Sequence, residues 1–390
     1  MPYEFVRLLM LQWICTTGFV TSETADDVKN LIKKLFHSDG YSKNIRPLIK
    51  QSDVVEVETH MILNTIIDFN EKEESIKISG YLGMAWYDDF LKWNPTDYGG
   101  LGRLLFPQND VWRPDVALHN SFRNFTGLGS NNLLLAVDNT GAVTWYPYQI
   151  LEATCDVDIT YFPFDTQECP LKFSAWSYTI DEVIMIEGEK GIITEQFEEN
   201  SRWSLVNTTV EEVKGVDAMV IFKMKLKRKS TFYVFNILIP MVLLSFLNVL
   251  TFVLPVSSGE RASYAVTVFL SLAVFLTIVA SEIPKNSNTI SIVSVYMTAV
   301  LALRFATVMT SLLELRLASR AKDKDLISSG YMAIYRLARI CQCRHDGKSR
   351  SATEIGWTDV VSALDYFLFW LFIGLTFVAT VVLFVVAVKR

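Results

Sequence analysis

Hydroxyl-bearing and acidic side chains recur at helical spacing along one apolar stretch of this 390-residue chain. Successive members are three or four positions apart in alternation, so they share one face of a helix. The stripe consists of Glu260, Ser263, Thr267, Leu270, Val274, Thr277 and Ser281. A helix buried in a bundle more usually hides an apolar stripe. A polar stripe interrupted by two apolar residues predicts a water-filled pore with a hydrophobic constriction at Leu270 and Val274.

Glu260 opens this stripe and would lie at the inner mouth of such a pore. A ring of carboxylates at a pore mouth attracts cations and repels anions, so monovalent cations are the predicted permeant ions. The alternative for Glu260 is a charged side chain that only snorkels to the membrane interface. At the other end, Ser281 is followed by Glu282, which is turned by about 100° around the helix axis. This arrangement does not predict whether Ca²⁺ permeates.

Four apolar runs are long enough to cross a bilayer as helices, which takes about 20 residues each. They are Phe232–Leu254, Ala262–Ser281, Asn286–Leu313 and Tyr366–Val388. Four such lengths favour a membrane bundle over the buried helices of a soluble protein. The third run carries Arg304 near its middle, where an arginine is costly and is usually paired or functional. No partner for it is evident from the sequence.

Export of the front half is indicated by residues 1–22, in which one basic residue precedes a short apolar stretch, as in a secretory signal peptide. N-glycosylation sequons begin at Asn124 and Asn207. Five basic residues within 223–229 oppose this orientation under the positive-inside rule, but they alternate with apolar residues as one face of a strand does. Residues 315–364 hold nine basic and five acidic residues, which predicts a cytoplasmic loop, and both ends of the mature chain then face outward.

Charge is divided unevenly along the chain. Residues 23–217 carry 32 acidic and 16 basic side chains, whereas residues 218–390 carry 9 and 19. This division excludes a single soluble globule, and an acidic front half disfavours nucleic acid as a partner. The four histidines are scattered without metal-ligand spacing, and neither a Ser-His-Asp pattern nor a phosphate loop is present. We therefore expect no enzyme activity, no metal site and no cofactor.

The front half has the pattern of a β-sandwich. Residues 24–36 have helical spacing, and short alternating runs follow, including 54–59, 75–78 and a hairpin over 133–146. The expected fold class is an α+β membrane protein, with an extracellular β-sandwich and N-terminal helix joined to a four-helix transmembrane bundle. The expected regions are a signal peptide over 1–22, the extracellular sandwich over 23–231 and the first three membrane helices over 232–314. A cytoplasmic loop over 315–364, with a basic amphipathic helix over 331–344, and the fourth membrane helix over 365–390 follow.

Two of the five cysteines, Cys155 and Cys169, lie in the predicted extracellular domain and enclose 13 residues. Cys15 belongs to the signal segment, and Cys341 and Cys343 belong to the cytoplasmic loop, where thiols stay reduced. The number of cysteines alone does not specify a function. The enclosed loop contains Phe162-Pro163-Phe164-Asp165, an apolar tip with two aromatic residues around a proline that can adopt the cis form.

Several motifs stand in order along the chain. They are Trp112-Arg113-Pro114-Asp115, His119-Asn120-Ser121, the 13-residue loop, Lys172–Tyr178, Asn236–Pro240 and Gly259-Glu260-Arg261. With them, residues 25–390 resemble the Cys-loop pentameric ligand-gated ion channels, in particular the nicotinic acetylcholine receptor branch. The resemblance implies a Cys155–Cys169 disulfide and a plasma-membrane protein in contact with lipid. It also implies a homo- or heteropentamer with four further subunits, in which five copies of Glu260 ring the pore.

The resemblance further implies a small-molecule agonist held between subunits, where aromatic side chains attract a quaternary ammonium group by cation–π interaction. By motif, the site residues are Tyr81, His119, Thr144, Tyr146, Trp176 and Tyr178. Tyr81 stands where a tryptophan is usual and His119 where a tyrosine is expected. Residues 206–220 lack the adjacent cysteines and the aromatic residues usual at the tip. The alternative is therefore an accessory or orphan subunit, or a surface binding protein, that does not respond to acetylcholine or conduct alone.

Coupling between agonist and pore is implied to pass through Phe162, Pro163, Phe164, Asp165, Arg228 and Pro284. The turn at 70–74 joins this region. Opposite charges make Asp165 and Glu71 the candidate partners of Arg228 and Lys285.

Overall fold

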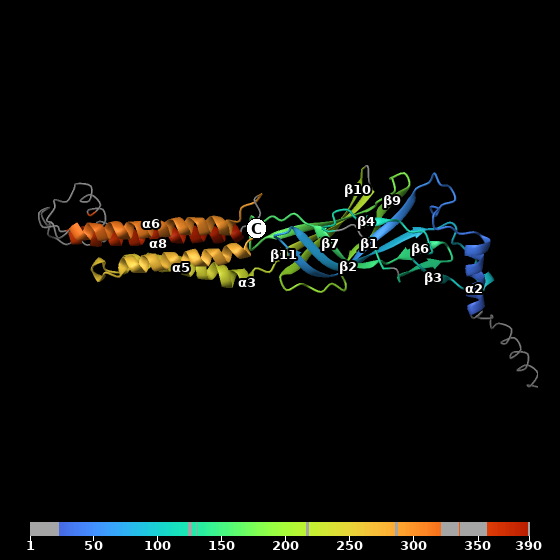
Figure 1. Cartoon of the computed structure of the whole chain (residues 1–390), viewed down its shortest axis with the longest axis horizontal. Helices are drawn as coiled ribbons and strands as arrows, with labels where there is room; N and C mark the ends of the chain where they lie inside the picture. Colours follow the sequence, from blue (N-terminus) through green and yellow to red (C-terminus); the bar gives the residue numbers. More distant parts are fainter. Residues whose placement is uncertain are drawn as a thin grey trace, which may run out of the picture. The chain divides into compact units, whose positions relative to one another are not determined.

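A computed structural model describes residues 23–123, 127–130, 132–215, 218–284, 288–320, 335 and 357–388 (Figure 1). The predicted signal segment, the sequon at Asn124, Lys285 and, apart from Tyr335, the predicted amphipathic helix lie outside these residues. The chain divides into two units, each taken by itself below. One comprises residues 1–156, 168–200 and 205–226, and the other comprises residues 157–167, 201–204 and 227–390.

The first unit is a β-sandwich preceded by a helix, as the sequence predicts. The larger sheet has the order β3-β5-β6-β2-β1-β9, with β7 also paired to β2, and the smaller has the order β10-β11-β8-β4. The larger sheet contains β1 Val55–Asn70, β2 Ser75–Tyr87, β3 Arg103–Pro107, β5 Leu134–Asp138, β6 Ala142–Trp145, β7 Tyr148–Thr154 and β9 Val183–Ile193. The smaller contains β4 Val116–Leu118, β8 Thr166–Ala175, β10 Trp203–Lys214 and β11 Ala218–Arg228.

The alternating runs form strands because one face of each can be buried. Along the start of β1, Val55, Val57 and Met61 are buried and Glu56 and Glu58 are exposed. The predicted hairpin over 133–146 is present as β5 and β6, which pair antiparallel. A short 3-10 helix, η2 Pro95–Tyr98, lies between β2 and β3.

Helix α2, Ala25–Lys33, confirms the predicted N-terminal helix. Thr24 accepts a hydrogen bond from the backbone of Asp27, and the Asp27 carboxylate accepts one from Thr24 in return. This reciprocal capping box satisfies amide groups that the first helical turn leaves without partners. A π-helical segment, η1 Lys34–Ser38, follows it.

The second unit contains four helices long and apolar enough to cross a membrane, at Thr231–Val253, Arg261–Glu282, Ile292–Ser319 and Asp359–Ala387. The first is composed of α3 Thr231–Tyr233, η3 Val234–Leu238, α4 Ile239–Val249 and η4 Leu250–Val253. The others lie in α5 Arg261–Glu282, α6 Ile292–Arg320 and α8 Trp357–Val388, with the short η5 Val256–Ser258 before α5.

The helix ends differ from the predicted spans in two places. Helix α6 continues to Arg320 and α8 already begins at Trp357, so both extend into the predicted cytoplasmic loop of 315–364. Polar residues can continue a helix beyond the bilayer because each added residue closes one further backbone hydrogen bond. A search for apolar runs therefore underestimates the length of such helices.

Within this unit, the end of the first span packs against α8. Val249, Phe252, Leu368 and Phe372 form a buried cluster, in which the two phenylalanine rings stack at 5.3 Å. Between α4 and α6, the Asn248 amide donates a hydrogen bond of 2.9 Å to the Thr307 hydroxyl. A polar contact of this kind fixes the rotation of one helix against its neighbour in an otherwise apolar bundle.

Candidate functional site

Helix α5 presents the predicted pore stripe away from the rest of its own chain. The seven residues from Glu260 to Ser281 that form the stripe are all exposed. The opposite face is buried and consists of Arg261, Ala265, Val268, Leu272 and Val279. In the apolar middle of the stripe, 60% of Leu270 and 55% of Val274 are accessible. Helix α5 therefore packs on one face and leaves the stripe uncovered by its own subunit.

Hydroxyl groups of the stripe donate their protons to the backbone of the same helix. Thr267 donates to the Ser263 carbonyl at 2.8 Å, and Thr277 and Ser281 make equivalent bonds of 2.7 and 2.6 Å one turn back along the helix. The oxygen lone pairs of Thr267 and Thr277 then remain available on the exposed side. A helix face lined with acceptor oxygens offers partial negative charge, which suits a cation that keeps part of its hydration shell.

Glu260 is the residue immediately before the first turn of α5. Its carbonyl accepts the first helical hydrogen bond, from Tyr264, while its side chain is exposed. Gly259 precedes it with φ of 77°, a left-handed backbone that a residue with a Cβ rarely adopts. This glycine allows the chain to turn sharply from η5 into α5, which brings Glu260 to the end of the stripe.

A buried ion pair links the tip of the 13-residue loop to the end of β11. Arg228 contacts Asp165 through two bonds, Nε to Oδ1 at 2.7 Å and Nη2 to Oδ2 at 3.0 Å. Both side chains are 2% exposed. The pairing that charge complementarity predicts for Asp165 and Arg228 is therefore present. Gln167 donates a further hydrogen bond of 2.6 Å to the same carboxylate.

Aromatic rings surround the guanidinium of Arg228. Its Cζ atom lies 4.3 Å from the centre of the Trp203 ring, 5.0 Å from that of Phe162 and 5.5 Å from that of Tyr233. Rings at this distance attract a cation through their negative faces, most strongly where water is excluded. The predicted coupling residues Phe162 and Arg228 are thus in direct contact, and Trp203 and Tyr233 complete a site that sequence reasoning missed.

The loop tip also contacts the segment that joins α5 to α6. The backbone amide of Ile159 donates to the Thr289 hydroxyl at 3.3 Å, and the amide of Ile292 donates to the Thr160 carbonyl at 3.0 Å. Pro284, at the end of α5, is buried. Because Ile292 is the first residue of α6, the loop tip is hydrogen-bonded directly to the start of a membrane helix.

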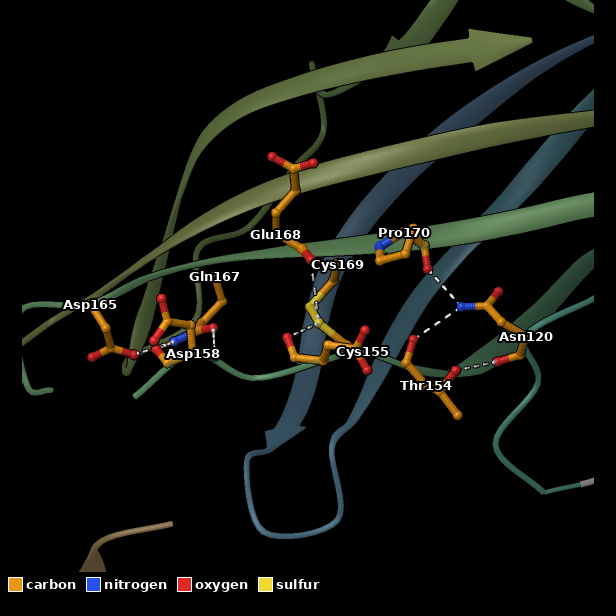
Figure 2. The surroundings of a disulfide bond; sticks show 10 residues. Asn120, Thr154, Cys155, Asp158, Asp165, Gln167, Glu168, Cys169 and Pro170 are labelled. Carbon is orange, nitrogen blue, oxygen red and sulfur yellow. Dashed lines mark hydrogen bonds between the residues drawn. A yellow bond between two sulfur atoms is a disulfide. The ribbon is translucent and has the colours of Figure 1, made fainter. Parts of the chain in front are cut away.

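The neck of the loop is closed by the Cys155–Cys169 disulfide (Figure 2). Beside it, the Asn120 amide donates to the carbonyls of Thr154 at 3.0 Å and Pro170 at 2.9 Å, one on each side of the neck. Asn120 was not among the predicted site residues, although it directly follows His119. It holds the two strands of the neck together independently of the disulfide, and the Phe162–Pro163 peptide bond within the loop is cis.

The predicted agonist residues fall into two groups on different sheets. On the larger sheet, the Tyr81 ring lies 6.2 Å from that of Tyr146, and Thr144 lies in β6 just before Tyr146. Directly after β4 and β8 of the smaller sheet, the His119 ring lies 6.1 Å from that of Trp176. Tyr178 follows Trp176, and its hydroxyl accepts a hydrogen bond of 3.3 Å from the Trp112 indole. Each group therefore offers part of an aromatic site.

Tyr148 belongs with the first group and was missed. Its ring lies 6.3 Å from that of Tyr81, and its hydroxyl is 3.3 Å from that of Ser79. Tyr146 and Tyr148 flank Pro147 at the short connection from β6 to β7, so the closeness of these two tyrosines in the sequence was a usable signal. Behind this group, an added Cβ at Gly83 would lie 2.2 Å from the His60 ring, so a larger residue there would require that ring to move.

A cavity of about 410 Å³ adjoins Trp176 within the same unit. Its walls include Arg113, Leu128 and Trp145, and the Arg113 guanidinium lies 5.3 Å from the centre of the Trp145 ring. Burial lowers the pKa of Arg113 from its usual value. Trp176 is 56% exposed, so one side of this indole lines the cavity while much of it stays accessible.

Comparison with known proteins matches both parts of the chain to one family. Residues 28–230 match the neurotransmitter-gated ion-channel ligand binding domain, and residues 237–330 match the neurotransmitter-gated ion-channel transmembrane region. Acetylcholine receptor subunit epsilon of Xenopus laevis is 33% identical over 83% of this chain and 67% of its own length. Subunit delta of Rattus norvegicus is 32% identical over 84% and 66%.

Neuronal acetylcholine receptor subunit alpha-9 of Gallus gallus is 34% identical over 78% of this chain and 64% of its own length. The chain thus spans about two thirds of the length of the relatives it matches. The two matched regions correspond to the sandwich and to the first three long helices. The chain belongs to the neurotransmitter-gated ion-channel family.

Proposed function

We propose that this chain is a subunit of a pentameric plasma-membrane channel that conducts cations when a small-molecule agonist binds between subunits. The observation that carries the proposal is the two-sided character of α5. Its apolar face is buried in its own subunit, and the stripe that begins at Glu260 and passes through Leu270 is exposed. Five copies arranged around an axis would turn this stripe toward a shared lumen.

Selectivity in this proposal comes from charge at the pore mouth. Five copies of Glu260 would form a ring of carboxylates, and the threonine and serine oxygens farther along the stripe would continue a cation-attracting surface. Leu270 and Val274 would form the hydrophobic constriction. Monovalent cations are therefore the proposed permeant ions.

The agonist site in this proposal is shared between two subunits. His119, Trp176 and Tyr178 of one subunit would face Tyr81, Thr144 and Tyr146 of the next, with Tyr148 added to the second group. The separation of the two groups on different sheets supports this arrangement, since neither group alone surrounds a ligand. Exposed aromatic faces favour a cationic ligand, held by cation–π attraction.

Coupling would run from β11 through the Arg228–Asp165 pair to the loop tip. From there it would pass through the hydrogen bonds of Ile159 and Thr160 to Thr289 and Ile292, and so to the outer end of α5 and its Pro284. The buried, bidentate geometry of the ion pair supports this route, because a displacement of β11 cannot leave the loop tip in place without breaking both bonds.

The proposal is tested by expressing the chain in oocytes, alone and with a nicotinic receptor subunit, and applying a panel of amine transmitters. Glu260→Gln should lower the permeability of Na⁺ relative to Cl⁻, measured from reversal potentials in diluted NaCl. The matched control is Glu282→Gln, at the other end of the same helix and off the stripe. If Glu260→Gln leaves the reversal potential unchanged, Glu260 does not determine the ion selectivity. Current only with a co-expressed subunit would indicate an accessory role.

A further inference from the structure

Arg261, the neighbour of Glu260, contacts each of the other three long helices of its subunit. Its Nη2 atom pairs with the Glu314 carboxylate near the end of α6, and with the Asp365 carboxylate of α8 at 2.6 Å. Its Cζ atom lies 5.3 Å from the centre of the Phe252 ring at the end of the first span. One side chain thus connects four helices at a single level of the bundle.

This contact is buried. Arg261 is 0% exposed, the Glu314 side chain 1% and the Asp365 side chain 17%. The two carboxylates share one guanidinium nitrogen, and Nε and Nη1 of Arg261 have no hydrogen-bond partner among the described residues. With all three groups ionised, the network carries one excess negative charge in a medium of low dielectric constant.

Apolar residues of similar volume usually stabilise a core as well as a buried ion pair does. What the ionic network adds is direction, because an arginine hydrogen-bonded to a carboxylate on one helix and ion-paired with a carboxylate on another tolerates little rotation of the helix that carries it. The rotation of α5 about its own axis determines which side chains of this helix face away from the bundle.

Consecutive residues of a helix point about 100° apart. With Arg261 held toward α6 and α8, the side chain of Glu260 is directed out of the bundle, where it is exposed. We infer that Arg261, Glu314 and Asp365 form a positioning network that holds the Glu260 carboxylate at the pore mouth and so determines how strongly the channel prefers cations. This inference rests on the proposed function and deepens it.

The test uses the full chain in a Leu270→Ser background, in which a polar side chain replaces the hydrophobic constriction, so current flows without an agonist. Glu314→Gln and Arg261→Gln keep the size of each side chain approximately and remove its charge. Each is expected to lower the Na⁺/Cl⁻ permeability ratio by roughly threefold or more, because displaced carboxylates no longer form a compact ring. Arg261→Lys, which keeps the charge, should restore part of the ratio.

Asp359→Asn is the matched control, since it removes a carboxylate near the start of α8 outside the network. Surface biotinylation measures how much of each variant reaches the membrane, so a folding defect is separated from a change in selectivity. A ratio that stays unchanged in Glu314→Gln and Arg261→Gln channels overturns the inference. The absence of any current from Leu270→Ser channels at the surface overturns the proposed function instead.

A second readout does not depend on current. Glu260→Cys, in a background with Cys341 and Cys343 replaced by serine, reports how accessible position 260 is to a charged thiol reagent. Labelling quantified by mass spectrometry should slow at least about threefold when Glu314→Gln is added, as expected for a side chain that has left an exposed face. An equal labelling rate with and without Glu314→Gln would contradict a positioning role.

Discussion

Arg228, at the end of β11, and Arg304, in the middle of α6, are both almost completely buried, at 4% and 1% exposure, yet their surroundings differ. Arg228 has a bidentate carboxylate in Asp165 and three aromatic rings around its guanidinium. Arg304 makes one hydrogen bond within the residues that the structure describes, from Nη1 to the Val268 carbonyl of α5 at 3.0 Å. Its Nε and Nη2 atoms have no hydrogen-bond partner in the described part of the chain.

The difference separates two ways of keeping a cation inside a protein. A paired charge is stabilised by its partner, so removal of either member leaves the other buried and unpaired. When a charge held by a helix backbone carbonyl is removed, only that carbonyl is left behind, and it still accepts a hydrogen bond from a backbone amide of its own helix. Substitutions at the two arginines should therefore have unequal effects on stability.

Arg228→Met should produce the largest loss, about 3–5 kcal/mol, because the Asp165 carboxylate would stay buried without its counter-charge. The measurement is thermal unfolding of the purified protein in detergent. Arg228→Met combined with Asp165→Leu should recover most of the loss, since neither charge then remains. A double variant as unstable as Arg228→Met alone would show that the pair is not the source of the effect.

A buried carboxylate without a cation provides the converse case. Asp88 is fully buried in the sandwich and forms no ion pair within the described residues, and burial raises its pKa from 3.8 to about 6. Hydrogen bonds from the Tyr41 hydroxyl at 2.8 Å and the Phe90 amide at 2.9 Å oppose the shift. The hydroxyl of Tyr41 in turn accepts a bond of 2.9 Å from the Trp112 amide, so Asp88 anchors the Trp112 motif.

The sign of the pH dependence follows from this raised pKa. Between pH 4 and 6 the unfolded state releases the proton of Asp88 while the folded state retains it, so stability falls by about 3 kcal/mol across this window. Below pH 4 the stabilisation is fully present, and above pH 6 no further loss comes from this group. Denaturant unfolding of wild type and Asp88→Asn at pH 4, 5, 6 and 7 measures it. Parallel pH profiles would contradict the assignment.

The contrast between the two arginines also explains what the sequence could predict. Asp165 and Arg228 carry opposite charges, so their pairing could be proposed from the sequence alone. Arg304 donates to a backbone carbonyl, which every residue possesses, so the residue type of Val268 does not identify it as the acceptor. The polar stripe of α5 was predictable because the spacing of residues in the sequence determines which of them share one face of a helix.

The aromatic groups were only partly predictable for a related reason. Motifs placed Trp176 and Tyr146 in the site, but which sheet carries each group depends on strand order, a long-range property. Trp203 belongs to none of the motifs, and its contact with Arg228 depends on how the start of β10 lies beside the end of β11. Asn120 was visible in its motif, yet its role across the neck required the positions of Thr154 and Pro170.

The contribution of the aromatic rings around Arg228 can be separated from that of its carboxylate. Trp203→Leu should cost about 1–2 kcal/mol through loss of the nearest ring, whereas Trp203→Phe should cost less because a ring remains. Thermal unfolding again provides the measurement, and the same two variants in an Arg228→Met background serve as the control. An equal cost in both backgrounds would attribute the effect of Trp203 to apolar packing alone.

Arg304→Met should have the smallest effect on stability, within about 1 kcal/mol of wild type or slightly stabilising, because it removes a buried charge that has no counter-charge among the described residues. Arg304→Lys is the matched comparison, since it keeps the charge and loses the planar guanidinium. Val268 adjoins the proposed pore residue Thr267, so five guanidinium groups would lie just behind the lining and repel cations. Single-channel conductance should therefore rise in Arg304→Met and stay near wild type in Arg304→Lys. A loss of stability as large as that of Arg228→Met would mean that Arg304 has a counter-charge in the assembled channel.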